Sequence, residues 1–357
     1  MTIANMARLA MPQARPSLPH REATRVGNAP ALVDRFGRVH DDLRISVTDR
    51  CNLRCVYCME EDTTFAPHAA ILTFEEIVRV ASVARGMGIR SVRITGGEPL
   101  QRRGIVDLVA RVASLGFSDV AMTTNGVGLA RFARDLERAG LRRLNVSCDS
   151  LRSDRFARIR RRGRLDDVLE AMDAAEVAGL APLKVNVVLV AGMNDDEIED
   201  FAAFARRTKR IVRFIEFMPL DAGRAWNRDH LVPTEVVLER IASRWPLEPV
   251  EPVDQRDPSP AERYRFSDGE GEIGVVPSVT RPFCGTCNRL RLTADGAIRN
   301  CLFSDNELSV RDLLRRGGSD AEIAALLRRA VGSKLPGHGI NESGFLQPRR
   351  SMSMIGG

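Results

Sequence analysis

Aromatic residues and long hydrophobic segments are both scarce in this chain of 357 residues. Aromatic side chains make up 5% of the sequence, too few to favour a protein that stacks nucleic-acid bases along its surface. No apolar run approaches the roughly 20 residues that a membrane-spanning helix requires. The segment through Arg21 has no continuous apolar stretch of the kind found in secretion signals. We therefore expect a cytoplasmic protein that binds neither membrane nor nucleic acid.

The composition is that of a globular protein with a large core and an excess of positive charge. Hydrophobic residues account for 44% of the sequence and charged residues for 28%, as in soluble globular chains. The net charge of +6 comes largely from arginine. This charge suits an anionic partner only in broad terms, because nucleotide phosphates, nucleic acid and plain solvent are all compatible with it.

Six of the seven cysteines fall in two groups, which indicates metal ligation rather than a disulfide framework. The first group, Cys51, Cys55 and Cys58, has C-x3-C-x2-C spacing. Three thiolates this close can hold three corners of a [4Fe–4S] cluster and leave the fourth iron open. A zinc site would need a fourth ligand nearby, and the nearest histidine is His68. Three unconnected core cysteines remain the plain alternative.

The second group, Cys284, Cys287 and Cys301, again provides three thiols and not four. A zinc ribbon would place a fourth ligand close to Cys301, although His338 is available from a distance. A three-cysteine iron–sulfur cluster with one open iron is the sharper hypothesis. Cys148 lies in a predicted buried strand and is interpreted as a core residue.

Alternating strand and helix patterns predict an α/β fold. Thr73 followed by Glu76 is a capping box that opens a helix with Ile77, Val80, Ala84 and Met87 on one face. Six strand–helix repeats in succession favour an incomplete (β/α)6 TIM-like barrel. The predicted strands are 44–48, 91–95, 119–123, 143–147, 183–190 and 211–217.

The unusual residues follow the ends of these strands. The first cysteine loop, Gly96–Pro99, Thr123–Gly126, Ser147 and Met218 all lie at or just beyond a strand's carboxyl end. That edge is where β/α barrels build active sites, so the pattern predicts an enzyme.

The predicted domain boundaries place the barrel between two less regular parts. We expect a mobile tail over 1–30, the barrel over 31–220, a region carrying the second cysteine group over 221–340, and a C-terminal tail over 341–357. Within the third part we expect a helix over 234–244, a linker over 246–260 and a hairpin over 263–276.

Three positive charges lie inside otherwise apolar predicted strands. Arg44, Arg93 and Lys184 would each cost several kcal/mol if buried without a partner. A bound triphosphate would supply that partner, while carboxylates at strand ends or exposure to solvent would also satisfy the charges. Arg289 and Arg291 alternate along a later predicted strand and can face one cavity together.

The motifs together resemble the GTP 3′,8-cyclase family of radical S-adenosylmethionine (SAM) enzymes. The resemblance covers residues 31–357, all but the tail. The C-x3-C-x2-C loop alone specifies only the superfamily, whereas the second three-cysteine group with Asn288–Arg291 attached specifies the family. The matching segments are 44–49 with the first cysteine loop, 93–100, 123–126, 145–147, 184–186, 213–218, 284–291, 301–303 and the terminal Gly-Gly.

This resemblance implies a radical SAM barrel with a C-terminal iron–sulfur extension, and a lyase reaction in molybdenum cofactor biosynthesis. A SAM-derived 5′-deoxyadenosyl radical would abstract the ribose 3′ hydrogen of GTP. The substrate radical would then attack guanine C8 and give 3′,8-cyclo-7,8-dihydro-GTP. The implied cofactors are SAM and two [4Fe–4S] clusters, one held by each cysteine group.

The resemblance also assigns residues and partners. The SAM contacts would be Tyr57, Gly97, Ser147 and Met218; the GTP contacts would be Arg44, Arg93, Thr123, Lys184, Arg289, Leu290 and Arg291. The terminal Gly356 and Gly357 would enter the active site and activate it. The expected partners are an electron donor, cyclic pyranopterin monophosphate synthase as recipient of the product, and a second copy in a homodimer.

Two other functions stay open. One is a peptide-modifying radical SAM enzyme, although auxiliary domains of that kind usually carry more cysteines. The other is a non-catalytic iron–sulfur or zinc regulator that binds nucleic acid through its arginines. The basic run Arg158–Arg164 is interpreted as a solvated helix face.

Overall fold

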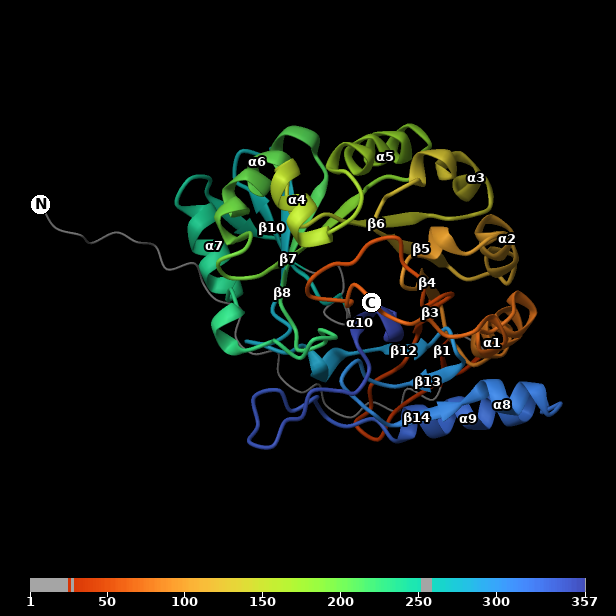
Figure 1. Ribbon diagram of the computed structural model, residues 1–357. Coiled ribbons are helices and arrows are strands. Elements are labelled where there is room, and N and C mark those ends of the chain that lie inside the picture. Colours follow the sequence, from red (N-terminus) through yellow and green to blue (C-terminus); the bar gives the residue numbers. More distant parts are fainter. Residues whose placement is uncertain (1–24, 27–28, 252–258, 357) are drawn as a thin grey trace, which may run out of the picture.

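The protein forms one long curved sheet with helices packed around its outer side (Figure 1). The structure is a computed structural model that describes residues 25–26, 29–251 and 259–356. Twelve strands of the described part hydrogen-bond in the order β14-β13-β12-β3-β4-β5-β6-β7-β8-β11-β10-β9.

The centre of the sheet is the predicted barrel of six parallel strands. Each strand pairs in parallel with the next one along the chain. The expected strand positions are confirmed, two of them to the residue (91–95 and 143–147). The six strands are β3 (Asp42–Ser46), β4 (Ser91–Thr95), β5 (Asp119–Thr124), β6 (Arg143–Ser147), β7 (Lys184–Leu189) and β8 (Ile211–Glu216).

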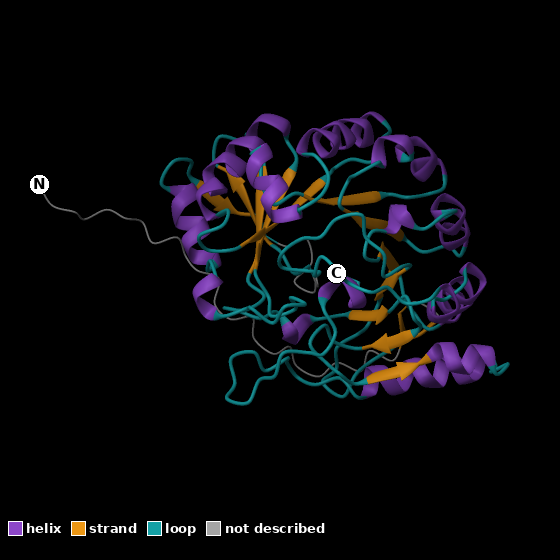
Figure 2. Ribbon diagram, in the orientation of Figure 1, coloured by secondary structure: helices purple, strands orange, loops and turns teal. Residues whose placement is uncertain are grey.

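The helices that follow these six strands cover the convex side of the sheet (Figure 2). Their apolar faces form the core with the outward side chains of the strands. The predicted capping box is present, since the Thr73 side chain accepts from the Glu76 N–H and the Glu76 side chain from the Thr73 N–H. The helices are α1 (Phe74–Gly86), α2 (Ile105–Ser114), α3 (Ala133–Arg138), α4 (Ser153–Arg160), α5 (Leu165–Val177), α6 (Ile198–Thr208) and α7 (Thr234–Ala242).

The C-terminal region extends the barrel sheet at both edges. β9 (Leu247–Pro249), β10 (Glu262–Phe266) and β11 (Glu272–Val276) join through β11, which pairs in parallel with β8. At the other edge β12 (Arg289–Leu292) pairs in parallel with β3 and is followed by β13 (Ala297–Arg299) and β14 (Glu307–Ser309). The two edges of the open barrel are therefore occupied by this region.

Three helices complete the chain: α8 (Val310–Arg315), α9 (Asp320–Gly332) and α10 (Met352–Ile355). Helix α10 lies at the centre of the ring of strands (Figure 1). The chain thus returns to the inside of the barrel.

The segments predicted to be irregular contain two pairs of short strands. The prediction of a linker from 246 is wrong at its start, because Leu247–Pro249 pairs with β10; residues 252–258 lie outside the described residues. Within the predicted N-terminal tail, β1 (Arg25–Val26) and β2 (Ala29–Pro30) form an antiparallel pair, and the prediction for 1–24 falls outside the described residues.

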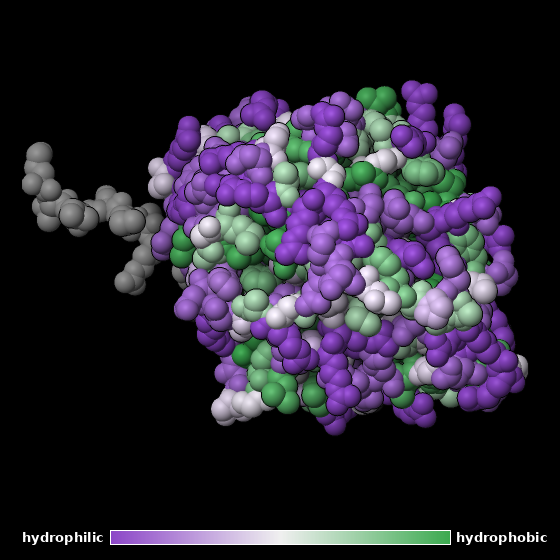
Figure 3. Space-filling model, in the orientation of Figure 1, coloured by the Kyte–Doolittle hydropathy of each residue, from purple (hydrophilic) through white to green (hydrophobic). Residues whose placement is uncertain are grey.

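The surface seen in Figure 3 is mostly hydrophilic, with hydrophobic residues scattered among the charged ones. Among the described helices, none is both long enough and apolar enough to cross a membrane.

Candidate active site

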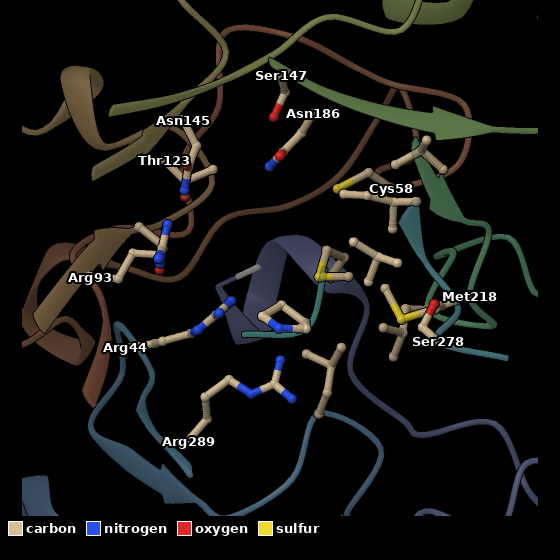
Figure 4. Close-up of a pocket in the computed structure, with 18 of the residues that line it drawn as sticks. Arg44, Cys58, Arg93, Thr123, Asn145, Ser147, Asn186, Met218, Ser278 and Arg289 are labelled. Atoms are coloured by element: carbon tan, nitrogen blue, oxygen red, sulfur yellow. The ribbon is translucent and has the colours of Figure 1, made fainter. Parts of the chain in front are cut away.

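A cavity of about 460 Å³ lies inside the curve of the sheet, and both cysteine groups line it. Figure 4 shows Cys58 and Met218 on one side of this cavity and Arg44, Arg93 and Arg289 on the other. The structure therefore brings the two motifs, which are more than 200 residues apart in sequence, to one space.

The register of the sheet arranges the cations of this cavity in a row. Arg291 of β12 is the direct partner of Arg44 on β3, and Arg44 is the direct partner of Arg93 on β4. Direct partners on parallel strands point to the same face, and a shift by one residue would turn a whole strand's side chains over. All three side chains line the cavity. A second row, Thr123, Asn145 and Lys184, follows on β5, β6 and β7 in the same way.

Arg44, Arg93 and Lys184 form no ion pair within the described part of the chain. The Nε atoms of Arg44 and Arg93 are buried without a hydrogen-bond acceptor there. Burial, followed by repulsion from Arg291 and Arg93, holds the pKa of Arg44 well below its usual value. Of the two alternatives raised by the sequence, neutralisation by strand-end carboxylates is thus not realised among the described residues.

The pKa values of Lys184 and Arg291 shift in the same direction. Burial and then Arg213 lower the pKa of Lys184 to about 8, and burial and then Arg289 lower that of Arg291 to about 10. Each shift means that the charged form is disfavoured in the ligand-free cavity. An anion bound here would relieve that cost.

The first cysteine loop is held by the end of α4. The backbone N–H groups of Arg54 and Val56 donate to the carbonyl oxygens of Arg160 and Ile159, both at 3.0 Å. Burial raises the pKa of Cys51 to about 11 and also raises the pKa of Cys55 and Cys58. Converging thiolates in such a place need a compensating cation, and the irons of a cluster supply it. The donor set therefore fits a three-cysteine cluster.

The second cysteine group is surrounded by cations. Arg289 Nη2 and Lys334 Nζ each lie 3.3 Å from Cys287 Sγ. Burial acts to raise the pKa of Cys287, but Arg289 and Lys334 bring the net pKa well below its usual value. Arg38, paired with Asp34, also donates to the Cys284 carbonyl at 2.7 Å. Thiolate is therefore the favoured form at Cys287, as metal ligation requires.

All seven cysteines are free thiols. Cys148 is fully buried in the hydrophobic core, and its Sγ donates to the Ser150 carbonyl at 3.3 Å. Its predicted place in the core is confirmed. Among the described residues, no group of three or more His, Cys, Asp or Glu side chains is close enough to hold a single metal ion, so the assignment of clusters depends on the cysteine pattern and on the surroundings of the thiols.

The four predicted SAM contacts line the same cavity as the first cysteine group. Tyr57, Gly97, Ser147 and Met218 all line the cavity. The Tyr57 hydroxyl donates to Asp149 Oδ2 at 2.5 Å, and its ring packs edge-on against Phe217 with centroids 6.3 Å apart.

Close packing of the backbone leaves no room for a side chain at Gly97. A Cβ there would come within 2.5 Å of two backbone oxygens, those of Asp49 and Arg50. The Gly97 N–H donates to the Thr48 carbonyl at 2.7 Å, which ties this loop to the start of the cysteine loop. Close backbone packing is therefore sufficient to explain the glycine at position 97.

The predicted GTP contacts divide into two sets. Arg44, Arg93, Thr123, Lys184, Arg289 and Arg291 line the cavity. Leu290 does not: its side chain is fully buried in the hydrophobic core, because it lies between two residues that face the other way on β12. The side chain of Leu290 thus lies in the core and does not line the cavity.

The C-terminal tail enters the site. The Gly356 carbonyl accepts from Arg291 Nη1 at 2.8 Å, and a Cβ at Gly356 would lie 2.7 Å from Thr95 Oγ1. Ser353 lines the cavity and hydrogen-bonds the Cys58 thiol. Gly357 lies outside the described residues.

Several lining residues were not predicted as site residues. Arg213 donates from Nε and Nη2 to Asn186 Oδ1 at 3.0 and 2.7 Å, and both side chains line the cavity. Asn186 lies two positions after Lys184 on β7, so strand periodicity would have found it. Arg160, from the basic run, lies 3.3 Å from Cys55 Sγ. No periodicity on its own helix indicates that contact.

Comparison with known families covers nearly the whole barrel and the C-terminal region. Residues 45–205 match the Radical SAM superfamily, and residues 210–340 match the family described as Molybdenum Cofactor Synthesis C. These two ranges contain the first and second cysteine groups respectively.

Curated relatives match over most of their length. The GTP 3′,8-cyclase of Streptomyces coelicolor is 48% identical over 340 residues, which cover 94% of this chain and 99% of the relative. The GTP 3′,8-cyclase of Rhodopirellula baltica is 47% identical over 333 residues, 92% of each chain.

Among solved structures, Streptococcus suis SuiB bound to S-adenosylmethionine superposes with a TM-score of 0.60 at 13% identity, covering 89% of this chain and 78% of that one. At this identity the likeness shows the fold alone, and the radical SAM fold agrees with the sheet described above. The identity to the curated cyclases is far higher and nearly full-length. The chain belongs to the GTP 3′,8-cyclase family of radical SAM enzymes.

Proposed function

We propose that this chain converts GTP to 3′,8-cyclo-7,8-dihydro-GTP in molybdenum cofactor biosynthesis, in the cytoplasm. The observation that supports the substrate is the row of Arg291, Arg44 and Arg93, in which no member forms an ion pair with a described carboxylate. A triphosphate brings several negative oxygens that guanidinium groups bind through paired N–H donors. GTP would therefore neutralise charges that the described residues leave without an ion pair.

The first cysteine group would hold the cluster that binds SAM. Once bound, that cluster and SAM supply an organic radical able to remove a hydrogen atom from a sugar carbon. Cys51, Cys55 and Cys58 are the ligands in this proposal, and Tyr57, Ser147 and Met218 line the space beside them. The chain's own contribution is to hold the ribose near this end of the cavity and to exclude water from it.

The second cysteine group would hold a second cluster at the opposite end. Cys284, Cys287 and Cys301 are its ligands, and Arg289 lies between this group and the row of cations. With phosphates on the row and the base near the second group, the ribose would lie toward the first group. Thr123 and Lys184, on the neighbouring strands, would contact the substrate from the side.

The proposal extends to the tail and the partners. Bound phosphate would compete with the Gly356 carbonyl oxygen for the Arg291 guanidinium, so the position of Gly356 would depend on bound phosphate. The reaction needs an electron donor, and its product would pass to cyclic pyranopterin monophosphate synthase. A homodimer remains part of the proposal.

Product analysis tests the function. The protein, reconstituted anaerobically with iron and sulfide, is incubated with SAM, a low-potential reductant and each nucleoside triphosphate in turn, and the products are separated by mass spectrometry. We expect 5′-deoxyadenosine together with an isomer of GTP, and only with GTP. Deoxyadenosine without any nucleotide change would contradict the substrate, and no SAM cleavage by fully loaded protein would contradict the enzyme.

Cysteine variants test the two cluster sites. Cys58→Ala should abolish SAM cleavage, whereas Cys148→Ala, in the core, should retain it as the matched control. Replacement of Cys284, Cys287 and Cys301 by Ala should remove about half of the bound iron. Iron content equal to that of the parent would contradict the second cluster.

A further inference from the structure

Arg160 is a buried arginine that no step of the proposed function uses. It is the last residue of α4, and its side chain is 3% exposed. Its Nη1 donates to Cys55 Sγ at 3.3 Å, across 105 residues of sequence. A guanidinium is expensive to bury, so a contact of this kind requires partners that repay the cost.

One partner of Arg160 is a carboxylate that is fixed in turn by other groups. Asp149, 1% exposed, places Oδ2 2.7 Å from Arg160 Nη2. The Val188 N–H donates to Asp149 Oδ1 at 2.9 Å, and the Tyr57 hydroxyl donates to Oδ2. The guanidinium therefore forms an ion pair with Asp149 through Nη2, outside hydrogen-bond geometry, and donates a hydrogen bond to the sulfur through Nη1.

Arg160 is also held through its main chain. Its carbonyl oxygen accepts from the Arg54 N–H at 3.0 Å, within the cysteine loop itself. The loop and the guanidinium are thus positioned by one helix end, and the distance from Nη1 to the sulfur is set by backbone as well as by side-chain contacts.

A second arginine, Arg54, lies inside the cysteine loop, and its Nη1 donates to the carbonyl oxygens of Cys51 and Leu53, both at 2.8 Å, and not to a sulfur. Within residues 29–251 and 259–356, Arg160 is the one arginine or lysine whose side chain hydrogen-bonds to the sulfur of Cys51, Cys55 or Cys58. The nearby Glu98 is buried, and burial raises its pKa to about 7. The hydrogen bond from Arg160 to Cys55 is therefore the one cationic contact that the described residues make to a sulfur of this group.

We propose that Arg160 is a positioning residue that raises the reduction potential of the first cluster through its N–H···Sγ bond to Cys55. Reduction adds a negative charge that is shared by the cysteine sulfurs, and a fixed cationic donor stabilises the reduced form more than the oxidised form. Asp149 holds the donor in place. The inference rests on the proposed first cluster and is independent of the identity of the substrate.

The test is a redox titration of the first cluster, monitored by electron paramagnetic resonance. The full chain with Cys284, Cys287 and Cys301 replaced by Ala serves as the parent, so that one cluster gives the signal. Arg160→Met removes the donor and leaves Asp149 uncompensated. We expect the equilibrium constant for one-electron reduction to fall at least tenfold, which corresponds to a potential about 59 mV more negative.

Two further variants make the result decisive. Arg158→Met, two residues away on the same helix and 71% exposed, is the matched control and should leave the potential unchanged. Arg160→Lys, which keeps the positive charge, should recover part of the shift. An Arg160→Met protein with full iron content and the parent's potential would overturn the inference.

A structural role alone would lower cluster content without moving the potential. Should Arg160→Met fail to bind iron, Arg160→Gln is titrated instead, since the amide keeps N–H donors for Asp149 but loses the charge. An unchanged potential in that variant overturns the inference. Absence of iron from the parent would refute the cluster proposal and not the role of Arg160.

Discussion

Replacement of Arg44 by methionine should stabilise the ligand-free protein and weaken GTP binding at the same time. Arg44 lies between Arg291 and Arg93 in the register of β12, β3 and β4, and its Nε is buried without an acceptor among the described residues. Methionine keeps the length and much of the volume of the side chain while it removes a charge that two neighbours repel.

The gain in stability and the loss of GTP affinity have different physical origins. Replacing buried charge by a packed apolar group contributes about 1–3 kcal/mol to the free energy of unfolding. With an unfolding entropy of roughly 2.1 cal/mol/K per residue, this raises the melting temperature of a 357-residue chain by about 1–4 °C. A lost charge-assisted contact to phosphate costs about 1.5–3 kcal/mol, a roughly 10- to 150-fold weaker Kd.

The assay compares the loaded proteins without SAM under anaerobic conditions, by thermal unfolding and by calorimetric titration with GTP. Arg349→Met is the control, because that side chain is 89% exposed and should change neither quantity appreciably. A variant that melts lower than the parent would show that Arg44 has a structural partner. An unchanged Kd for GTP would refute its role toward phosphate.

Three further predictions concern single side chains. Since the pKa of Lys184 is lowered to about 8, GTP affinity should fall as the pH rises through 8, and the fall should be smaller in Lys184→Met. In the unfolded chain the pKa of Lys184 keeps its ordinary value near 10.5, so the unfolded state binds more protons than the folded state between pH 8 and 10.5. The free energy of unfolding of the parent, relative to that of Lys184→Met, should therefore rise across this pH window. A difference in unfolding free energy that does not change with pH would contradict the burial of this amine. Gly97→Ala should lower the iron content, because the added Cβ would lie 2.5 Å from the carbonyl oxygens of Asp49 and Arg50 and would displace the cysteine loop. Gly86→Ala is the control and should bind iron normally, because the space around Gly86 is open. Equal iron content in both variants would argue against the close approach of Gly97 to this loop. Leu290→Ala should cost about 2–5 kcal/mol of stability as a core truncation, and a variant with weaker GTP binding but an unchanged melting temperature would place this side chain in the cavity instead.

The sequence predicted local structure well where one short-range pattern dominated. Alternation of apolar and polar residues located β4 and β6 to the residue, and the pair Thr73 and Glu76 located the start of α1. These signals are local because a strand's period and a helix cap depend on neighbours within a few residues. The spacing of each cysteine group is local in the same sense.

Leu290 illustrates where a motif misleads. It stands inside a stretch whose neighbours line the cavity, but strand periodicity turns its side chain into the core. The family resemblance assigned Arg289, Leu290 and Arg291 together as GTP contacts. Alternation along the strand points the Leu290 side chain away from the other two. The segment Leu247–Pro249 was missed for another reason: its composition is that of a linker, and only its pairing with β10 makes it a strand.

What the sequence determined by itself was the succession of strands and helices, the two groups of thiols and the presence of costly cations in apolar strands. Tertiary structure decided how these meet. β11 and β12 pair with the two edge strands of the barrel, which places the second cysteine group opposite the first. The row of Arg291, Arg44 and Arg93 is a product of register between strands, and the contact of Arg160 with Cys55 joins residues 105 positions apart. Such contacts depend on the packing of whole elements, and no short stretch of sequence encodes them.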